Sequence, residues 1–438
     1  MAQAVNGFIP FIEKCPTAFH AVAEVKEILL KNGFMQWQEG LPLSDKNAMG
    51  EKGYFYIRND SSLIAFSMPG SSHSGMAAGV SDDADKSSIK GFRIIASHSD
   101  SPCFKVKTKP EIKVDDAYVK LNVEKYGGMI LSSWLDRPLG IAGRVIVKED
   151  GVFISKLVDV KQCAVIPNVA IHFNREINKG FEYNPQTDML PLFSGDKEQK
   201  LMEKIADTLG IEADAILGED LYLYADQKAM TVGTDQEFLV APRMDDLGCA
   251  YSTLMGFVNA APSEYISVYC LFNNEEVGSL TRQGADSDFA QRILTEIWNM
   301  TGSDKTFEAA LADSFLLSAD NAHALHPNHP EKSDVTNRPY LNGGIVLKFN
   351  GNAHYTTDGY SQAFVTDLCR LCEIPMQTFA NRSDLPGGST LGNIMMTHVS
   401  IPSADIGLPQ LAMHSAVETA GVKDMDDMVL LSKQFYNA

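Results

Sequence analysis

The chain has 438 residues, more than the roughly 250–300 at which a single hydrophobic core stops growing, so two domains are expected. Its composition is 45% hydrophobic and 21% charged, which is typical of a globular protein and excludes a disordered one. The formal net charge of -19 makes general binding to nucleic acid or to anionic membranes unfavourable.

Sequence features also bear on the compartment. No segment approaches the roughly 20 continuous apolar residues of a membrane-spanning helix, and the N-terminus lacks the basic and apolar regions of a secretory signal. The number of cysteines, 7, is odd, and Cys270 lies in an apolar run, which favours reduced thiols over a disulfide framework. A cytoplasmic protein is therefore expected. The CxxC pair Cys369 and Cys372 is interpreted as structural, with a redox or zinc role as the alternative.

The N-terminal part is predicted to be helical over roughly its first 60 residues. The clearest helix signal lies at 22–34, where apolar residues recur at helical spacing and Gly33 stands near the end. Residues 71–90 are small, polar and charged, which predicts a loop in which His73 is solvated.

Four short apolar runs each stop at charged or imidazole side chains. Such runs are typical of buried strands in an α/β sheet, where sites form beyond the carboxyl ends of the strands. The four polar clusters are therefore expected to meet in space. The runs are 92–97, ending at His98 and Asp100; 265–272, ending at Glu275 and Glu276; 314–319, ending at Asp320; and a stretch from about 400 that ends at His414.

The middle of the chain has a different pattern. Alternating β sequence dominates 106–235, with one helix-like run at 196–210. We interpret 106–235 as a mainly-β domain inserted into an α/β catalytic domain, which is made of 1–105 and 236–438.

The strongest chemical signal is the adjacent pair Glu275 and Glu276. Neighbouring side chains at a strand end point to different sides. One carboxylate can therefore bind a metal ion while the other acts as general base toward a water molecule. The alternative is a solvated acidic turn.

Two further clusters fit the same chemistry. His98 can bind zinc while Asp100 orients it; the alternative is a strand-end histidine bonded to a turn aspartate. Asp245 precedes a helix-like run and could bridge two metal ions, since each carboxylate oxygen can take one ion. The alternative is a helix N-cap.

Asp320 and His414 complete a set of two histidines and three carboxylates. Mixed nitrogen and oxygen ligands favour zinc, cobalt or manganese over calcium. A rival three-histidine site at 323–329 is disfavoured because Pro327 and Pro330 break the helical spacing. The glycine-rich run at 384–392 lacks the lysine of a P-loop, so a substrate-facing turn is preferred to nucleotide binding.

Over nearly its whole length the chain resembles the aspartyl aminopeptidases, which are two-metal exopeptidases. Residues 15–22 (CPTAFHAV) are similar to the family's Ser-Pro-Thr-Pro-Phe-His-Ala-Val. The other matching motifs are HSDSP (98–102), YGG (126–128), WLDRPLGIAGRV (134–145), IPNVAIHFNR (166–175), PRMDD (242–246), NNEEVGS (273–279), DNAHALHPN (320–328), GGSTLG (387–392) and MHSAVETAG (413–421).

The resemblance implies a zinc-peptidase-like α/β/α catalytic domain with a central mixed sheet, and two divalent ions per subunit. Its implied subunit arrangement is a tetrahedral homododecamer, with the inserted domain making dimer contacts and His172 reaching into a neighbour's active site. From sequence alone, His172 is interpreted as an ordinary strand histidine. The implied metal ligands are His98, Asp245 as the bridge, Glu276, Asp320 and His414, with Glu275 as general base and Asp100 supporting His98.

The chain departs from the family pattern near Lys348, which is the candidate partner of an acidic substrate side chain. The family's Gln and Arg are replaced by Ala353 and His354, and Asp246 stands where Asn is common. The alternative for Lys348 is an exposed strand lysine. We expect an aminopeptidase that removes N-terminal Asp or Glu from peptides. The alternatives are a broader aminopeptidase or a deacylase acting on neutral residues, and a binding protein with a dead site.

Overall fold

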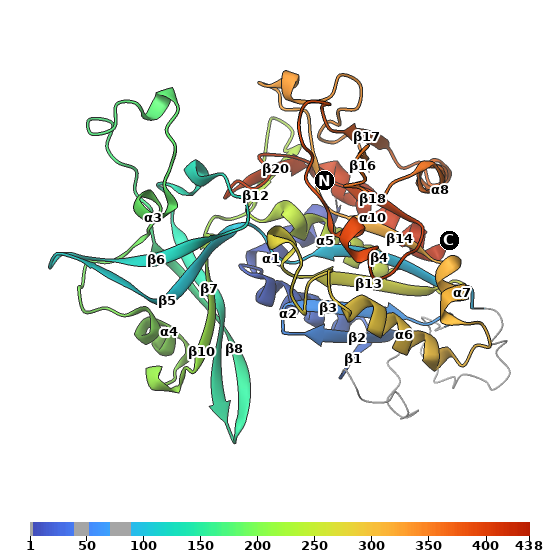
Figure 1. Cartoon of the computed structure of the whole chain (residues 1–438), viewed down its shortest axis with the longest axis horizontal. Coiled ribbons are helices and arrows are strands. Elements are labelled where there is room, and N and C mark those ends of the chain that lie inside the picture. Colours follow the sequence, from blue (N-terminus) through green and yellow to red (C-terminus); the bar gives the residue numbers. More distant parts are fainter. Residues whose placement is uncertain (1–2, 39–51, 71–88) are drawn as a thin grey trace.

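The computed structural model describes residues 3–38, 52–70 and 89–438. A β-rich lobe stands beside a larger body that holds both described ends of the chain (Figure 1). The loop predicted at 71–90, including His73, lies outside the described residues except for 89 and 90.

The body is built on a nine-stranded mixed sheet. Its strand order is β1-β2-β3-β13-β4-β14-β18-β16-β17. The strands are β1 (Phe34–Trp37), β2 (Gly53–Arg58), β3 (Ser62–Ser67), β4 (Phe92–His98), β13 (Ile266–Phe272), β14 (Phe315–Ala319), β16 (Ile345–Phe349), β17 (Met376–Ala380) and β18 (Ser403–Gly407). The N-terminal prediction is thus right for two helices and wrong at 34–37 and 53–58, because the aromatic and β-branched sequence there forms β1 and β2 instead.

Helices cover both faces of this sheet. Ile94 and Ile95 are adjacent on β4 and pack into different hydrophobic clusters, one on each side, because strand side chains alternate. One layer contains α1 (Gln3–Glu13), α2 (Ala18–Lys31), α5 (Met244–Val258), α8 (Gly359–Leu371) and α10 (Val422–Asn437); the other contains α6 (Phe289–Thr301), α7 (Phe307–Ala312) and α9 (Leu391–Met395). The predicted α/β/α architecture with a mixed sheet is confirmed.

The β-rich lobe is a second sheet with its own core, of order β8-β7-β10-β5-β6-β9. The helix-like run of the sequence forms α4 (Leu201–Leu209), which packs on this sheet. The strands are β5 (Cys103–Val114), β6 (Tyr118–Tyr126), β7 (Leu139–Glu149), β8 (Val152–Ala164), β9 (Leu192–Ser194) and β10 (Gly218–Ala225), and a short helix α3 (Pro185–Asp188) lies nearby. A β-rich insert is therefore present.

A third, small sheet joins segments from both halves of the chain. Its order is β11-β12-β20-β19-β15. The strands are β11 (Met230–Val232), β12 (Phe238–Ala241), β15 (Ala322–His323), β19 (Pro409–Leu411) and β20 (Glu418–Gly421). Within the described ranges, no helix is both long and apolar enough to cross a membrane.

Candidate metal centre

Three neighbouring parallel strands of the central sheet end at the site. β4 pairs in parallel with β13 on one side and with β14 on the other, so their carboxyl ends share one edge. His98 is the last residue of β4, Glu275 and Glu276 lie in a 3-10 turn after β13, and Asp320 follows β14. The sequence prediction that these clusters meet is correct for these four residues.

The other two residues come from the small sheet. Asp245 lies at the junction between β12 and α5, and His414 lies in the loop between β19 and β20. The expectation that His414 follows a strand of the central sheet is wrong, because β18 is the central strand and the chain then crosses into β19 of the small sheet. The helix-cap alternative for Asp245 also fails: Arg243 occupies the N-cap, and the Asp245 carboxylate contacts both histidines.

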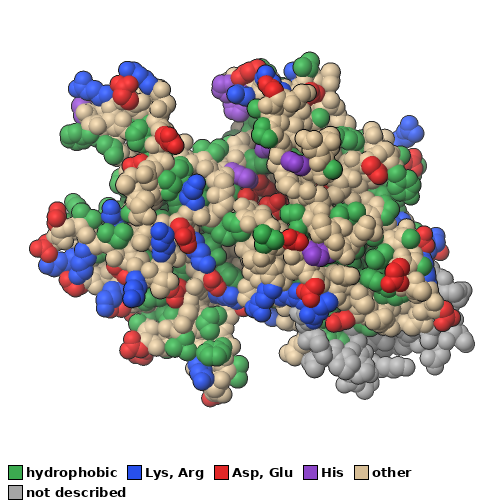
Figure 2. All heavy atoms as spheres, in the orientation of Figure 1, with side chains coloured by type: hydrophobic (Ala, Val, Ile, Leu, Met, Phe, Trp, Pro, Cys, Tyr) green, Lys and Arg blue, Asp and Glu red, His purple; other side chains and the backbone are tan. Residues whose placement is uncertain are grey.

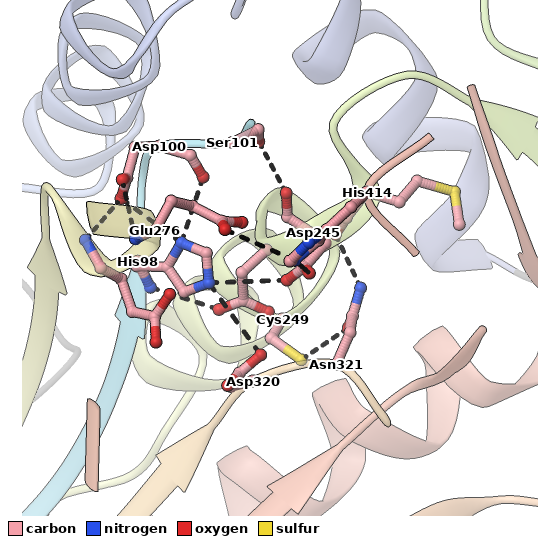
Figure 3. A network of polar contacts seen from close by, with 12 residues as sticks. His98, Asp100, Ser101, Asp245, Cys249, Glu276, Asp320, Asn321 and His414 are labelled. Atoms are coloured by element: carbon pink, nitrogen blue, oxygen red, sulfur yellow. Dashed lines mark hydrogen bonds and ion pairs between the residues drawn. The ribbon is translucent and has the colours of Figure 1, made fainter. Parts of the chain in front are cut away.

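The five residues surround one point (Figure 3). His98 Nε2 lies 3.5 Å from Asp245 Oδ1 and 3.9 Å from Asp320 Oδ1. His414 Nε2 lies 3.4 Å from Asp245 Oδ2 and 3.4 Å from Glu276 Oε2. Asp245 therefore stands between two half-sites and turns one oxygen toward each.

The donor set fits divalent metal ions. His98, Asp245, Asp246 and Asp320 have ligand atoms within 4.8 Å of one another, as do Asp245, Glu276 and His414. Asp245 Oδ1 is buried without a geometrically sound hydrogen bond, which costs free energy unless a cation or water binds it. Two imidazoles and three carboxylates suit zinc, cobalt or manganese.

The carboxylates and imidazoles of the cluster shift one another's pKa values. Burial would lower the pKa of His414, but contact with Asp245 raises it to about 9. Burial would raise the pKa of Asp245, but the contacts of His414 and His98 hold it below its ordinary value.

Asp100 connects His98 to the turn that carries the glutamates. Its Oδ1 lies 3.4 Å from His98 Nδ1, and its carboxylate accepts hydrogen bonds from the backbone N–H groups of Glu275 and Glu276, both at 3.2 Å. The hydroxyl of Tyr126, on β6 of the β-rich lobe, donates to Asp100 Oδ2 at 2.7 Å. Asp100 therefore occupies the supporting position expected for it.

Glu275 lies beside the cluster. Its carboxylate is within 4.8 Å of ligand atoms of His98 and Glu276. Burial, with added repulsion from Asp320 and Asp100, raises its pKa to about 8 in the absence of cations. Bound cations act in the opposite direction and favour the carboxylate form. Acidic and histidine side chains gather in the hollow between the lobe and the body (Figure 2).

Lys348 is buried, so the alternative of an exposed strand lysine is wrong. Its side chain is 2% exposed, and Nζ donates to the carbonyl oxygens of Asp320 at 2.8 Å and Asn321 at 3.3 Å. It also lies 3.6 Å from Asp320 Oδ2. An acidic substrate would have to compete with Asp320 for this ammonium, and the substrate role of Lys348 stays a prediction.

His172 lies outside the cluster. It sits in an exposed turn of the β-rich lobe, so the interpretation as a strand histidine is wrong. The groups of metal-ligating residues found in the described parts of the chain include neither His172, nor the rival histidines at 323, 326 and 329, nor the Cys369–Cys372 pair. Cys369 lies near the end of α8 and Cys372 caps it, as their helical flanks predicted.

Glu418 is a member of the site that the sequence reasoning missed. It is 2% exposed and accepts hydrogen bonds from the backbone N–H groups of Asp245 and His414. The available signal was a single acidic residue four positions after His414, among small and apolar residues.

Comparison with known proteins decides the family. The family model for aminopeptidase I zinc metalloprotease (M18) matches residues 11–436. This chain belongs to the M18 family. It is 43% identical over 439 residues to a probable M18 family aminopeptidase 2 of Clostridium acetobutylicum, covering 98% of this chain and 97% of that protein. It is therefore a metal-dependent aminopeptidase, a hydrolase of the zinc metalloprotease class.

Solved structures agree with this M18 assignment. The cryo-EM structure of the Ape4 and Nbr1 complex contains a chain that superposes with a TM-score of 0.90 at 32% identity, covering 99% of this chain and 85% of that one. The S. cerevisiae mApe1 dodecamer gives a TM-score of 0.85 at 28% identity, with 99% and 96% covered. The α/β/α body with a β-rich insert is thus the fold of M18 aminopeptidases.

Proposed function

We propose that this M18 aminopeptidase removes N-terminal Asp or Glu from peptides, using two divalent ions and Glu275 as general base. The observation that carries the proposal is the position of Asp245 between two half-sites, one with His98 and Asp320 and the other with His414 and Glu276. Zinc is the expected ion, and cobalt and manganese suit the same ligands.

The roles of the side chains follow from their positions. Bound divalent ions would lower the pKa of a water molecule and polarise the carbonyl of the scissile peptide bond. Glu275 would accept the proton of that water on its carboxylate and pass it to the leaving amine. Asp100 would hold the turn of Glu275 and the ring of His98 in one arrangement.

The acidic preference rests on the resemblance and on Lys348, which the proposal takes as the partner of the substrate side chain. The rival is a broader aminopeptidase or a deacylase of the same clan. One observation favours the rival: Lys348 Nζ is already engaged by Asp320 and the Asn321 carbonyl. His354 Nδ1 lies 3.3 Å from the carbonyl oxygen of Gly387, so the residue that replaces the family's Arg contacts the glycine-rich turn.

We further propose that 106–235 forms an inserted dimerisation domain and that the subunits assemble as a tetrahedral dodecamer in the cytoplasm. The dodecamer of S. cerevisiae mApe1 supports the assembly. His172 would reach a neighbouring subunit's site; its turn carries exposed apolar neighbours, Ile171 at 48% and Phe173 at 87%. All 7 cysteines are free, which suits a reducing compartment.

A matched substrate panel tests the reaction and its specificity. Peptide substrates that begin with Asp, Glu, Leu or Lys are assayed with and without added Zn²⁺, Co²⁺ or Mn²⁺, alongside N-acylated analogues. Fast, metal-dependent cleavage of the Asp and Glu members is expected. Faster cleavage of Leu or Lys members would remove the acidic preference, and cleavage of the N-acylated members alone would favour the deacylase.

A further inference from the structure

Glu418 is a buried carboxylate at the start of β20 that joins the two parts of the site supplied by the small sheet. Its Oε2 accepts a hydrogen bond from the backbone N–H of Asp245 at 3.0 Å, and its Oε1 accepts one from the backbone N–H of His414 at 2.9 Å. The side-chain amide of Gln410 lies 3.4 Å from Oε1. Both carboxylate oxygens are therefore occupied by groups that carry or flank proposed metal ligands.

The segments that Glu418 holds have unfavourable backbone conformations. Arg243, which precedes Asp245 by two residues, has φ 58°, and His414 itself has φ 66°. Ala412 has φ 58°. A residue with a side chain is destabilised by roughly 1–2 kcal/mol in this left-handed region. Such conformations therefore persist only where surrounding contacts fix them.

His98 is held mainly by strand pairing, and its backbone N–H also donates to the buried carboxylate of Asp246 at 3.2 Å. His98 is the end of β4, where backbone pairing with β13 reaches Phe272 opposite His98, and β14 pairs along the other edge of β4. His414 lies in a loop, and its own backbone N–H is bonded to Glu418 rather than to a neighbouring strand. Glu418 thus fixes the backbone of His414, whereas strand pairing together with Asp246 fixes that of His98.

We propose that Glu418 is a positioning residue that sets the separation of Asp245 and His414 and thereby the affinity of the half-site formed by Asp245, Glu276 and His414. This inference rests on the proposed two-ion site. Glu418 acts only through the backbones of the two ligands. Supporting partners of metal ligands typically contribute about 10–100-fold in metal affinity.

The test is Glu418→Gln, measured by titrating the metal-free protein with Zn²⁺ and with Co²⁺. The amide keeps the size of the side chain but presents an NH₂ group to one backbone N–H, so one of the two hydrogen bonds is lost. We expect one ion to bind about 10–100-fold more weakly while the ion held by His98 and Asp320 keeps nearly its original affinity.

The matched control is Asp424→Asn. Asp424 is also fully buried and accepts two backbone N–H groups, those of Asn342 at 2.7 Å and Gly344 at 2.8 Å, but at the start of α10. It should lose thermal stability like Glu418→Gln and keep both metal affinities. If Glu418→Gln binds both ions as the wild type does, or weakens both equally, the positioning role is wrong.

A second variant covers the case in which Glu418→Gln does not fold. Glu418→Asp keeps the charge but shortens the side chain, so it can reach only one of the two backbone groups, and the same one-ion loss is expected. Unchanged affinity for both ions in this variant would overturn the proposal. Wild-type protein that binds two ions but cleaves no peptide would contradict the proposed function and leave this test valid.

Discussion

The two halves of the metal centre are built by different means. The central sheet supplies His98 and Asp320 at adjacent strand ends, where parallel pairing fixes the backbone, and Glu276 from the turn after β13, whose backbone N–H groups donate to Asp100. The small sheet supplies Asp245 and His414 from a helix junction and a loop, where left-handed residues and one buried carboxylate fix it. Strand pairing fixes the backbone at a strand end, whereas a ligand in a loop depends on single side chains. Metal binding by the half from the small sheet should therefore be the more sensitive to mutation.

The largest expected effect is on the rate of peptide hydrolysis, which needs both halves of the metal centre. Glu275→Gln should lower kcat by about 10²–10⁴-fold while both ions remain bound, because the amide cannot accept the proton of the attacking water. Steady-state kinetics and metal analysis of the same sample measure this. The exposed Glu203→Gln on α4 is the control and should behave as wild type. Near-full activity of Glu275→Gln would exclude Glu275 as the base.

The next effect compares the two histidines directly. His98→Ala and His414→Ala should each lower the affinity for one ion. The loss should exceed the roughly 10–100-fold expected of a supporting residue, because a ligand itself is removed. The ion affected should differ between the two variants. Metal titrations monitored by calorimetry would measure this, and loss of the same ion from both would show that the centre is not divided as described.

A smaller effect is expected on stability. Lys348→Met should lower the free energy of unfolding by about 1–3 kcal/mol, because the carbonyl oxygens of Asp320 and Asn321 lose their buried donor. Denaturant unfolding measures it. Lys179→Met is the control: it removes an exposed pair with Glu176 in the β-rich lobe, whose side chains are 72% and 70% exposed, and should cost less than about 1 kcal/mol. Equal losses would contradict the support that Lys348 gives to Asp320.

The smallest effect is a dependence of the stability of the metal-free protein on pH. Contact with Asp245 raises the pKa of His414 to about 9 against burial, and burial raises the pKa of Glu418 to about 8 and of Asp424 to about 7. All three hold protons more tightly when folded, so the free energy of unfolding should fall as pH rises from about 6.5 to 9. Thermal unfolding with chelator present checks this. A Tm that rises over that range would contradict it.

The contrast between the two halves also explains what the sequence could predict. His98, Glu275 and Asp320 follow apolar runs, and strand direction alone places them together. His414 ends a similar run, and only Gly407 and Pro409 mark a break there, without indicating that the chain crosses to another sheet. The sequence cannot reveal the role of Glu418, because its partners are backbone groups 173 and 4 residues away.

Two other residues, Lys348 and His172, also differ from their predictions. Lys348 lies in the short apolar run 345–349, which suggests a strand, but its burial depends on the pairing of β16 with strands on both sides, which the local pattern cannot specify. His172 lies between apolar residues, which suggests a strand, yet the segment forms an exposed turn. The N-terminal helices were predictable from their periodicity, whereas β1 and β2 after them are short and defined by pairing.

The insertion of the β-rich lobe has a consequence for how the chain reaches its native state. β4 is a central strand of the body, yet Phe92 pairs with Ile266 and Arg93 with Phe315, so both of its neighbours are synthesised after the lobe. The lobe's sheet, by contrast, is drawn from one continuous stretch, Cys103 to Ala225. Contacts between distant residues form slowly, so the lobe should fold first on the ribosome while the catalytic sheet waits for the C-terminal half.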